Sequence, residues 1–149
     1  MPDLRDLRAG EYRALADLRH QIRRFLNFSE AAARAAGVEP QQHQLLLMLK
    51  AIMPERPTIR IIAERLQIQQ NSAAELVKRS VERGLVKRAQ GKEDRREASV
   101  RLTGAGERVL RGLSLAHRAE LRSAAPTLLR AVHALVDRPR AKKVARTER

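Results

Sequence analysis

The chain has 149 residues, with 31 Lys and Arg against 17 Asp and Glu, which gives a formal net charge of +14. This surplus favours a polyanionic partner, nucleic acid before an anionic membrane surface. The lack of cysteine excludes disulfides, thiol redox switches and thiolate metal sites. No apolar run reaches the roughly 18 residues of a transmembrane helix. The first ten residues lack the apolar core of a signal peptide, so we expect a cytoplasmic protein. Aromatic residues make up only 2%, so stacking platforms for single-stranded nucleic acid are poorly supplied.

The first third of the chain predicts two helices. Residues from about Leu7 to Ala36 have one apolar stripe and several arginines elsewhere, which is the pattern of a long amphipathic helix that ends at Gly37. Pro40 suits the first turn of the next helix. That helix contains the dense apolar run Leu45 to Leu49, so we expect it to be buried at the centre of the domain.

The middle of the chain predicts two short helices and a two-stranded ribbon. Thr58 is suited to cap a helix whose buried face has the i, i+3, i+4, i+7 spacing. The same spacing returns after a break at Gln67 to Asn71, and Gly84 ends that second helix. Apolar strand residues then flank a loop of charged residues. The residues that carry these patterns are Ile59, Ile62, Ala63 and Leu66, then Ala73, Leu76, Val77 and Val81, then Val86, Val100 and Leu102. Such an order predicts a winged helix-turn-helix. In a basic protein, this motif indicates that the protein binds DNA.

The last third predicts further helices. Gly104 and Gly106 precede a helical pattern, and Pro126 is expected to begin another helix. We therefore expect a mainly α protein with a small two-stranded β-wing. Its predicted segments are an N-terminal dimerisation helix (1–37), a winged helix-turn-helix (38–103), C-terminal dimerisation helices (104–137) and a basic, disordered tail (138–149). Because a winged helix needs neither terminal segment, their apolar stripes favour a second copy as partner.

Two stretches resemble MarR-type transcriptional regulators. Residues 66–88, LQIQQNSAAELVKRSVERGLVKR, resemble the turn and recognition helix of that family, and residues 94–106, DRREASVRLTGAG, resemble its wing. The resemblance implies an obligate homodimer that represses transcription, often until a small anionic or phenolic ligand releases it from DNA.

The second short helix would lie in the major groove with its N-terminal residues at base edges. Gln and Asn suit adenine, and a carboxylate can accept from the cytosine amino group. The predicted contacts are Gln69, Gln70, Asn71, Ser72, Glu75, Lys78 and Arg79. Arg79 has a second interpretation, as a brace inside the lobe.

The start of this helix has two readings. Ser72 and Glu75 have the spacing of a capping box, which would leave Gln70 and Asn71 outside the helix. The family resemblance instead implies a cap at Gln69. We favour Gln69, because Ile68 and Ala73 can then form a hydrophobic staple.

The wing contributes a second set of predicted DNA contacts, namely Lys92, Asp94, Arg95 and Arg96. Arginine is attracted to the negative potential of a narrow minor groove. The resemblance implies that Asp94 holds Arg96 by an ion pair. The alternative is an exposed pair that contributes only about 0–1 kcal/mol to stability.

Catalysis finds little support in the sequence. Its four histidines are far apart in the chain, and no phosphate-binding glycine loop or HExxH motif is present. We expect no enzyme, no cofactor and no metal, with a zinc site of His20, His43 and His117 as a minor alternative. A ligand pocket of His20, Arg23, Arg24 and His43 is a further hypothesis.

Two functions remain at this stage. The preferred one is a homodimeric, sequence-specific regulator, expected to be a repressor, that binds a palindromic site in double-stranded DNA. The alternative is a sequence-neutral basic nucleic-acid-binding or protein-interaction module that uses the winged helix for charge alone. Glu75 separates them, because a purely electrostatic binder gains nothing from a carboxylate that faces DNA. Membrane association is not expected, because aromatic anchors are lacking.

Overall fold

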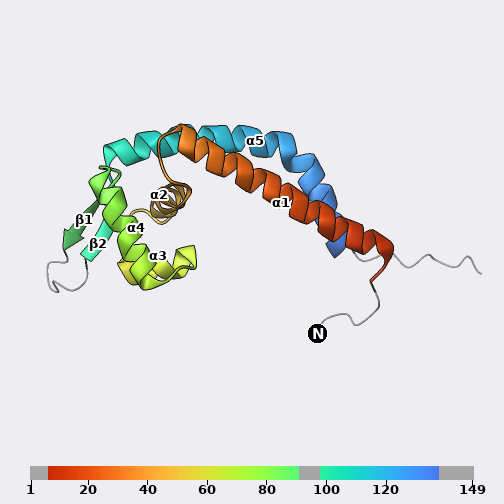
Figure 1. The fold of residues 1–149 in the computed structure, drawn as a ribbon, viewed down its shortest axis with the longest axis horizontal. Helices are drawn as coiled ribbons and strands as arrows, with labels where there is room; N and C mark the ends of the chain where they lie inside the picture. The colour runs from red at the N-terminus through yellow and green to blue at the C-terminus, as the bar shows by residue number, and fades with distance from the viewer. Residues whose placement is uncertain (1–6, 91–97, 138–149) are drawn as a thin grey trace, which may run out of the picture. The chain divides into compact units, whose positions relative to one another are not determined.

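The computed structural model describes residues 7–90 and 98–137. Its elements are α1 (Ala9–Ala35), α2 (Pro40–Ala51), α3 (Ile59–Leu66), α4 (Gln70–Glu82), β1 (Val86–Gln90), β2 (Ala98–Leu102) and α5 (Gly104–Val136) (Figure 1). The predicted fold class is confirmed, since the described chain is mostly helical with a two-stranded antiparallel sheet. None of the described helices is long and apolar enough to cross a membrane.

The chain forms two compact units whose boundaries fall inside α1 and α5. The central unit is Leu26–Glu120, and the terminal unit combines Met1–Phe25 with Leu121–Arg149. These boundaries are defined by compactness, whereas the segments predicted from the sequence are defined by role. Both α1 and α5 pass from one unit into the other without a loop.

Helix ends in the central unit follow the residues expected to stop them. Gly37 has a φ of 79° and Gly84 a φ of 68°, in the left-handed region that glycine adopts without strain. After α4, the amide of Leu85 donates to the carbonyl of Ser80 at 2.9 Å, which closes the helix end. Before α3, the Thr58 hydroxyl accepts from the amide of Ile61, so the predicted cap is confirmed.

The core of the central unit lies between α2, α3, α4 and the sheet. Val86 and Val100 are each 1% exposed, and the antiparallel register pairs Val86 with Leu102. Leu45, Leu46 and Leu49 of α2 are buried, as expected from the dense apolar run. Leu47 is 50% exposed, so α2 is not buried all round. This core gives α3 and α4 a rigid support.

One predicted helix boundary is wrong. α5 runs without a break from Gly104 to Val136, with Pro126 inside it rather than at the start of a new helix. Proline in a helix removes one backbone hydrogen bond. The neighbouring Ala124 and Ala125 have the highest helix propensity, and this favours continuation of the helix through the proline.

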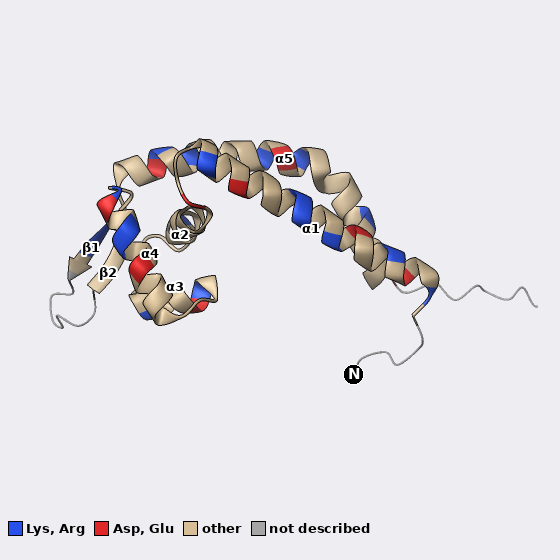
Figure 2. Ribbon diagram, viewed as in Figure 1, with Lys and Arg blue, Asp and Glu red and all other residues tan. Residues whose placement is uncertain are grey.

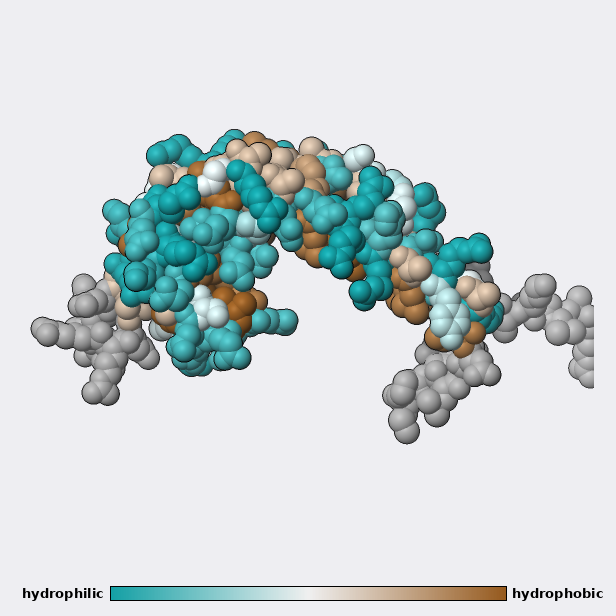
Figure 3. All heavy atoms as spheres, in the orientation of Figure 1, coloured by the Kyte–Doolittle hydropathy of each residue, from teal (hydrophilic) through white to brown (hydrophobic). Residues whose placement is uncertain are grey.

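The terminal unit buries little. Ala14 of α1 and Ala131 of α5 are buried and line one groove between the two helix ends. Seven large apolar side chains of this unit are exposed, whereas Leu18, Phe25, Leu128 and Leu135 are partly buried. Apolar patches are visible at the surface of the helices in Figure 3. The exposed residues are Leu7, Tyr12, Leu15, Ile22, Leu121, Leu129 and Val136.

Candidate nucleic-acid interface

The start of α4 follows the preferred of the two readings. Gln69 is the N-cap residue, with extended backbone and no hydrogen bond from its side chain to the helix. Ser72 lies inside the first turn, so the reading that made it the cap is wrong. Ile68 packs against the core and Ala73 is fully buried, as the staple requires. Gln70 and Asn71 therefore occupy the first turn of the helix.

α4 has one buried and one exposed face. Ala73, Leu76, Val77 and Ser80 point into the core, and the Ser80 hydroxyl donates to the carbonyl of Leu76 at 2.8 Å. Figure 2 shows residues of both charge signs on the ribbon of α4. The opposite face leaves six of the seven predicted contacts exposed: Gln69, Gln70, Asn71, Ser72, Glu75 and Lys78. Their amides, carboxylate and ammonium group are available to base edges and phosphates.

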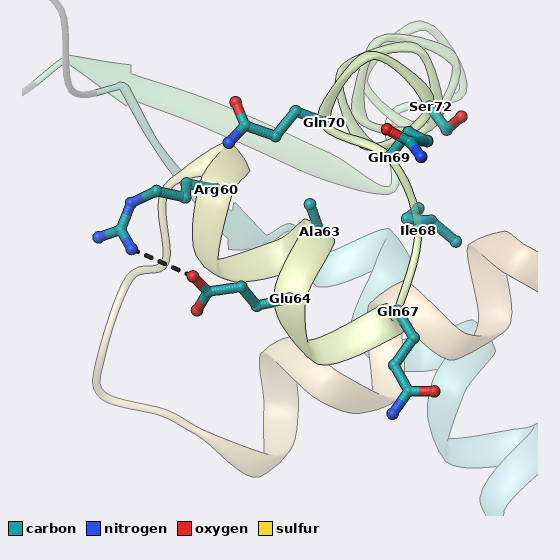
Figure 4. Close-up of a pocket in the computed structure, with 8 residues that line it drawn as sticks. All are labelled: Arg60, Ala63, Glu64, Gln67, Ile68, Gln69, Gln70 and Ser72. Carbon is teal, nitrogen blue, oxygen red and sulfur yellow. Dashed lines mark hydrogen bonds and ion pairs between the residues drawn. The ribbon is translucent and has the colours of Figure 1, made fainter.

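An open groove separates the exposed side of α3 from the start of α4 (Figure 4). On the α3 side of the groove, Arg60 forms an ion pair with Glu64, with 3.2 Å between Arg60 Nη1 and Glu64 Oε1. Gln67, Gln69 and Gln70 also line the groove. Sequence reasoning missed Arg60, Glu64 and Gln67, although their i, i+4, i+7 spacing marks a polar face of α3.

Arg79 has a partner within the protein. Its Nε and Nη2 atoms lie 3.3 and 3.1 Å from Oε2 of Glu39, which precedes α2. One turn later, Arg83 donates to the carbonyl of Gly37 in the same loop. These contacts agree with the second interpretation of Arg79, as a brace inside the lobe.

Basic side chains also line the sheet. Lys87 of β1 lies directly opposite Arg101 of β2, and both are exposed. Like charges at directly opposed positions destabilise a sheet, and an anion bound between them would offset that repulsion. The predicted wing contacts Lys92, Asp94, Arg95 and Arg96 lie outside the described residues.

The four residues of the hypothetical ligand pocket are divided between the two units. His20, Arg23 and Arg24 are exposed on α1 within the terminal unit. His43 is 5% exposed on α2 within the central unit. The structure therefore does not join the four residues in one compact unit.

His43 instead belongs to an aromatic cluster that sequence reasoning missed. Its ring centroid lies 4.7 Å from that of His117 on α5, and Phe28 of α1 meets His117 edge-on at 5.3 Å. His117 Nδ1 lies 2.7 Å from the carbonyl of Leu113, so this nitrogen must donate. Nε2 lies 2.7 Å from the Ser29 hydroxyl, which can accept from it or donate to it. Burial, and secondly the charge of His117, lower the pKa of His43.

The described residues contain no group of three or more His, Cys, Asp or Glu side chains arranged to hold a metal ion. The minor alternative of a zinc site at His20, His43 and His117 is therefore without support among these residues. Two of its three members, His43 and His117, are already in ring contact with each other.

Together, α2–α5 and the sheet define a winged helix-turn-helix protein. Residues 36–97 match the sequence model of the MarR family. Comparison with curated protein sequences found no match.

Solved structures with the same fold include MarR family regulators. AbsC, a MarR family transcriptional regulator from Streptomyces coelicolor, has a TM-score of 0.71 and 20% identity over 89% of this chain and 93% of its own. The MepR–DNA complex of S. aureus has a TM-score of 0.66 and 17% identity over 74% of this chain and 80% of its own. The YusO protein of Bacillus subtilis has a TM-score of 0.63 and 21% identity over 85% and 94% of the two chains. At these identities the likeness shows the fold.

Proposed function

We propose that this protein is a MarR-type transcriptional regulator that binds a specific site in double-stranded DNA. The observation that carries the proposal is the exposed polar face of α4, held by a buried opposite face and beginning with Gln70 and Asn71. Amide side chains at the start of a recognition helix are suited to bidentate bonds with adenine. The match of residues 36–97 to the MarR family model and the net charge of +14 support the same function. DNA in complex with MepR, a protein of this fold, adds further support.

The proposal includes a homodimer on a palindromic operator. Support comes from the terminal unit, whose long apolar side chains are exposed in the single chain. If a second copy covered them, each Å² of apolar surface removed from water would stabilise the dimer by about 25 cal/mol. A two-fold axis then matches two half-sites about one helical turn of DNA apart. Repression follows if the operator overlaps a promoter, and such a regulator acts in the cytoplasm.

No reaction is assigned to this protein, and release by a small ligand stays outside the proposal. His20, Arg23 and Arg24 lie in one unit and His43 in the other.

Selection from a random duplex library, followed by salt titration of the enriched sequence, tests this function. We expect one palindrome whose affinity exceeds that of random duplex by at least about 10³-fold at physiological salt. If no sequence is enriched and affinity simply collapses between 50 and 200 mM salt, binding is electrostatic alone. That result would favour the sequence-neutral module.

The wing is tested by Arg96→Ala. Loss of an arginine that enters the minor groove should weaken operator binding by about tenfold or more, with an unchanged melting temperature. Arg111→Ala is the matched control, because Arg111 is exposed on α5 and its loss removes the same charge. Equal affinities of the two variants would refute the assignment of Arg96 to DNA.

A further inference from the structure

Glu39 lies in a loop that is held in place at both ends. On one side Gly37 closes α1, and the amide of Val38 donates to the carbonyl of Ala33 at 3.0 Å. On the other side the amide of Glu39 donates to Oε1 of the buried Gln42 at 2.9 Å. The backbone of Glu39 is therefore held in place. Its side chain belongs to the capping box of α2, where it accepts from the backbone of Gln42, and its carboxylate is about half exposed beside α4.

Arg79 of α4 has two carboxylates within reach. Glu75 precedes it by four residues on the same helix, which is the spacing of a favourable ion pair. The guanidinium instead contacts Glu39, through Nε at 3.3 Å and Nη2 at 3.1 Å. Among the described residues, Glu75 has neither an ion pair nor a hydrogen bond, and it is exposed. The contact with Glu39 therefore leaves the carboxylate of Glu75 available.

This arrangement has consequences for DNA binding. A carboxylate that is paired with arginine cannot accept freely from a cytosine amino group, whereas an unpaired one can. A released Arg79 would also be free to contact a phosphate, which raises affinity for every sequence alike. Both effects would lower the preference for the operator.

We propose that Glu39 is a specificity-determining residue that acts on DNA recognition through Arg79. It holds the guanidinium away from Glu75 and from the phosphates, so that Glu75 stays free to contact a base. This inference rests on the proposed function, because it requires α4 to lie in the major groove. Glu39 is a positioning residue and does not itself touch DNA.

The test is Glu39→Gln, which keeps the size of the side chain and removes the charge that holds Arg79. We expect affinity for random duplex to rise a few-fold, and the magnitude of the salt slope to rise by up to about 0.9, the contribution of one phosphate contact. The ratio of operator to random affinity should fall by about tenfold, and base preference should relax at the position that Glu75 contacts. A brace with only a structural role would instead lower both affinities, together with the melting temperature.

Two further variants make the test decisive. Glu107→Gln is the matched control, since Glu107 is paired with Lys50 of α2 at 2.9 Å and not with a residue of α4, and its loss changes the net charge equally. The double variant Glu39→Gln/Arg79→Gln should restore the affinity ratio, because no arginine is released. If the wild type prefers an operator but Glu39→Gln matches Glu107→Gln, the role of Glu39 is refuted while the proposed function stands. If the wild type shows no sequence preference, it is the proposed function that fails.

Discussion

The two units of the chain differ in how completely they bury their large apolar side chains. In the central unit, Leu45, Leu46, Ile62 and Leu76 are 0% exposed, and helices and sheet share one core. In the described part of the terminal unit, only Ala14 and Ala131 are buried. Seven of the large apolar side chains there are between 38% and 65% exposed, so each lacks part of the roughly 1.5–3 kcal/mol that full burial provides. The central unit therefore has a hydrophobic core of its own, whereas the terminal helices leave apolar surface that the proposed second copy would cover.

The largest expected effect is from a charge placed on the terminal unit. Leu129, 51% exposed in the single chain, should lie in the proposed dimer interface. Leu129→Asp should give a monomer by light scattering or sedimentation. Operator affinity should fall on the order of 100-fold, because two linked half-site contacts become one.

Leu47→Asp is the matched control for that change, since Leu47 is 50% exposed but belongs to the central unit. It should leave the oligomeric state unaltered. A dimer that survives Leu129→Asp, or one that Leu47→Asp also dissociates, would contradict the division of roles between the two units.

The second effect measures how closely the central unit is packed. A Cβ atom on Gly106, near the start of α5, would overlap the carbonyl oxygen of Leu85. That oxygen also accepts from the amide of Thr103 at 3.1 Å, so it is not free to move. Gly106→Ala should lower the free energy of unfolding by about 1–3 kcal/mol, as overpacking does. Chemical denaturation of the purified protein measures this difference.

Gly112 provides the contrast within the same helix, because its Cβ would meet nothing within 4 Å. Gly112→Ala should raise the free energy of unfolding by about 0.5–1 kcal/mol, since alanine favours a helix interior. If Gly106→Ala proves as stable as Gly112→Ala, the approach of Leu85 to α5 is not tight.

The smallest effect is a pH dependence of the stability of the central unit. Burial lowers the pKa of His43 below its usual 6.5, so the unfolded chain takes up the proton more readily than the folded chain. The contribution to stability is fully present above about pH 6.5 and is lost as pH falls through the folded pKa. Denaturation midpoints between pH 7.5 and 5 should therefore fall for the wild type and fall less for His43→Gln.

His133→Gln is the control for this titration, because His133 is exposed on the terminal part of α5. It should show the wild-type profile. If His43→Gln keeps the wild-type profile, or if His133→Gln flattens it, the pH dependence of stability does not come from His43.

The sequence by itself determined the local structure of this protein. Thr58, Gly37 and Gly84 mark helix ends because their side chains, or the lack of one, act on the neighbouring backbone. The spacing of Ile62, Ala73 and Leu76 predicted the buried faces, since helical periodicity is a local property. The resemblance further led to Gln69 as the cap of α4, where a search for capping residues alone would have chosen Ser72.

Only the tertiary structure decided which side chains meet across the chain. Arg79 pairs with Glu39 forty residues earlier rather than with Glu75 on its own helix. The helical periodicity of the sequence cannot predict a contact between residues so far apart in the chain. His43, Ser29 and His117 come together from three helices. The continuation of α5 through Pro126 likewise depended on a balance between helix propensity and one lost hydrogen bond. Local rules specify the elements, whereas long-range packing and charge select their partners.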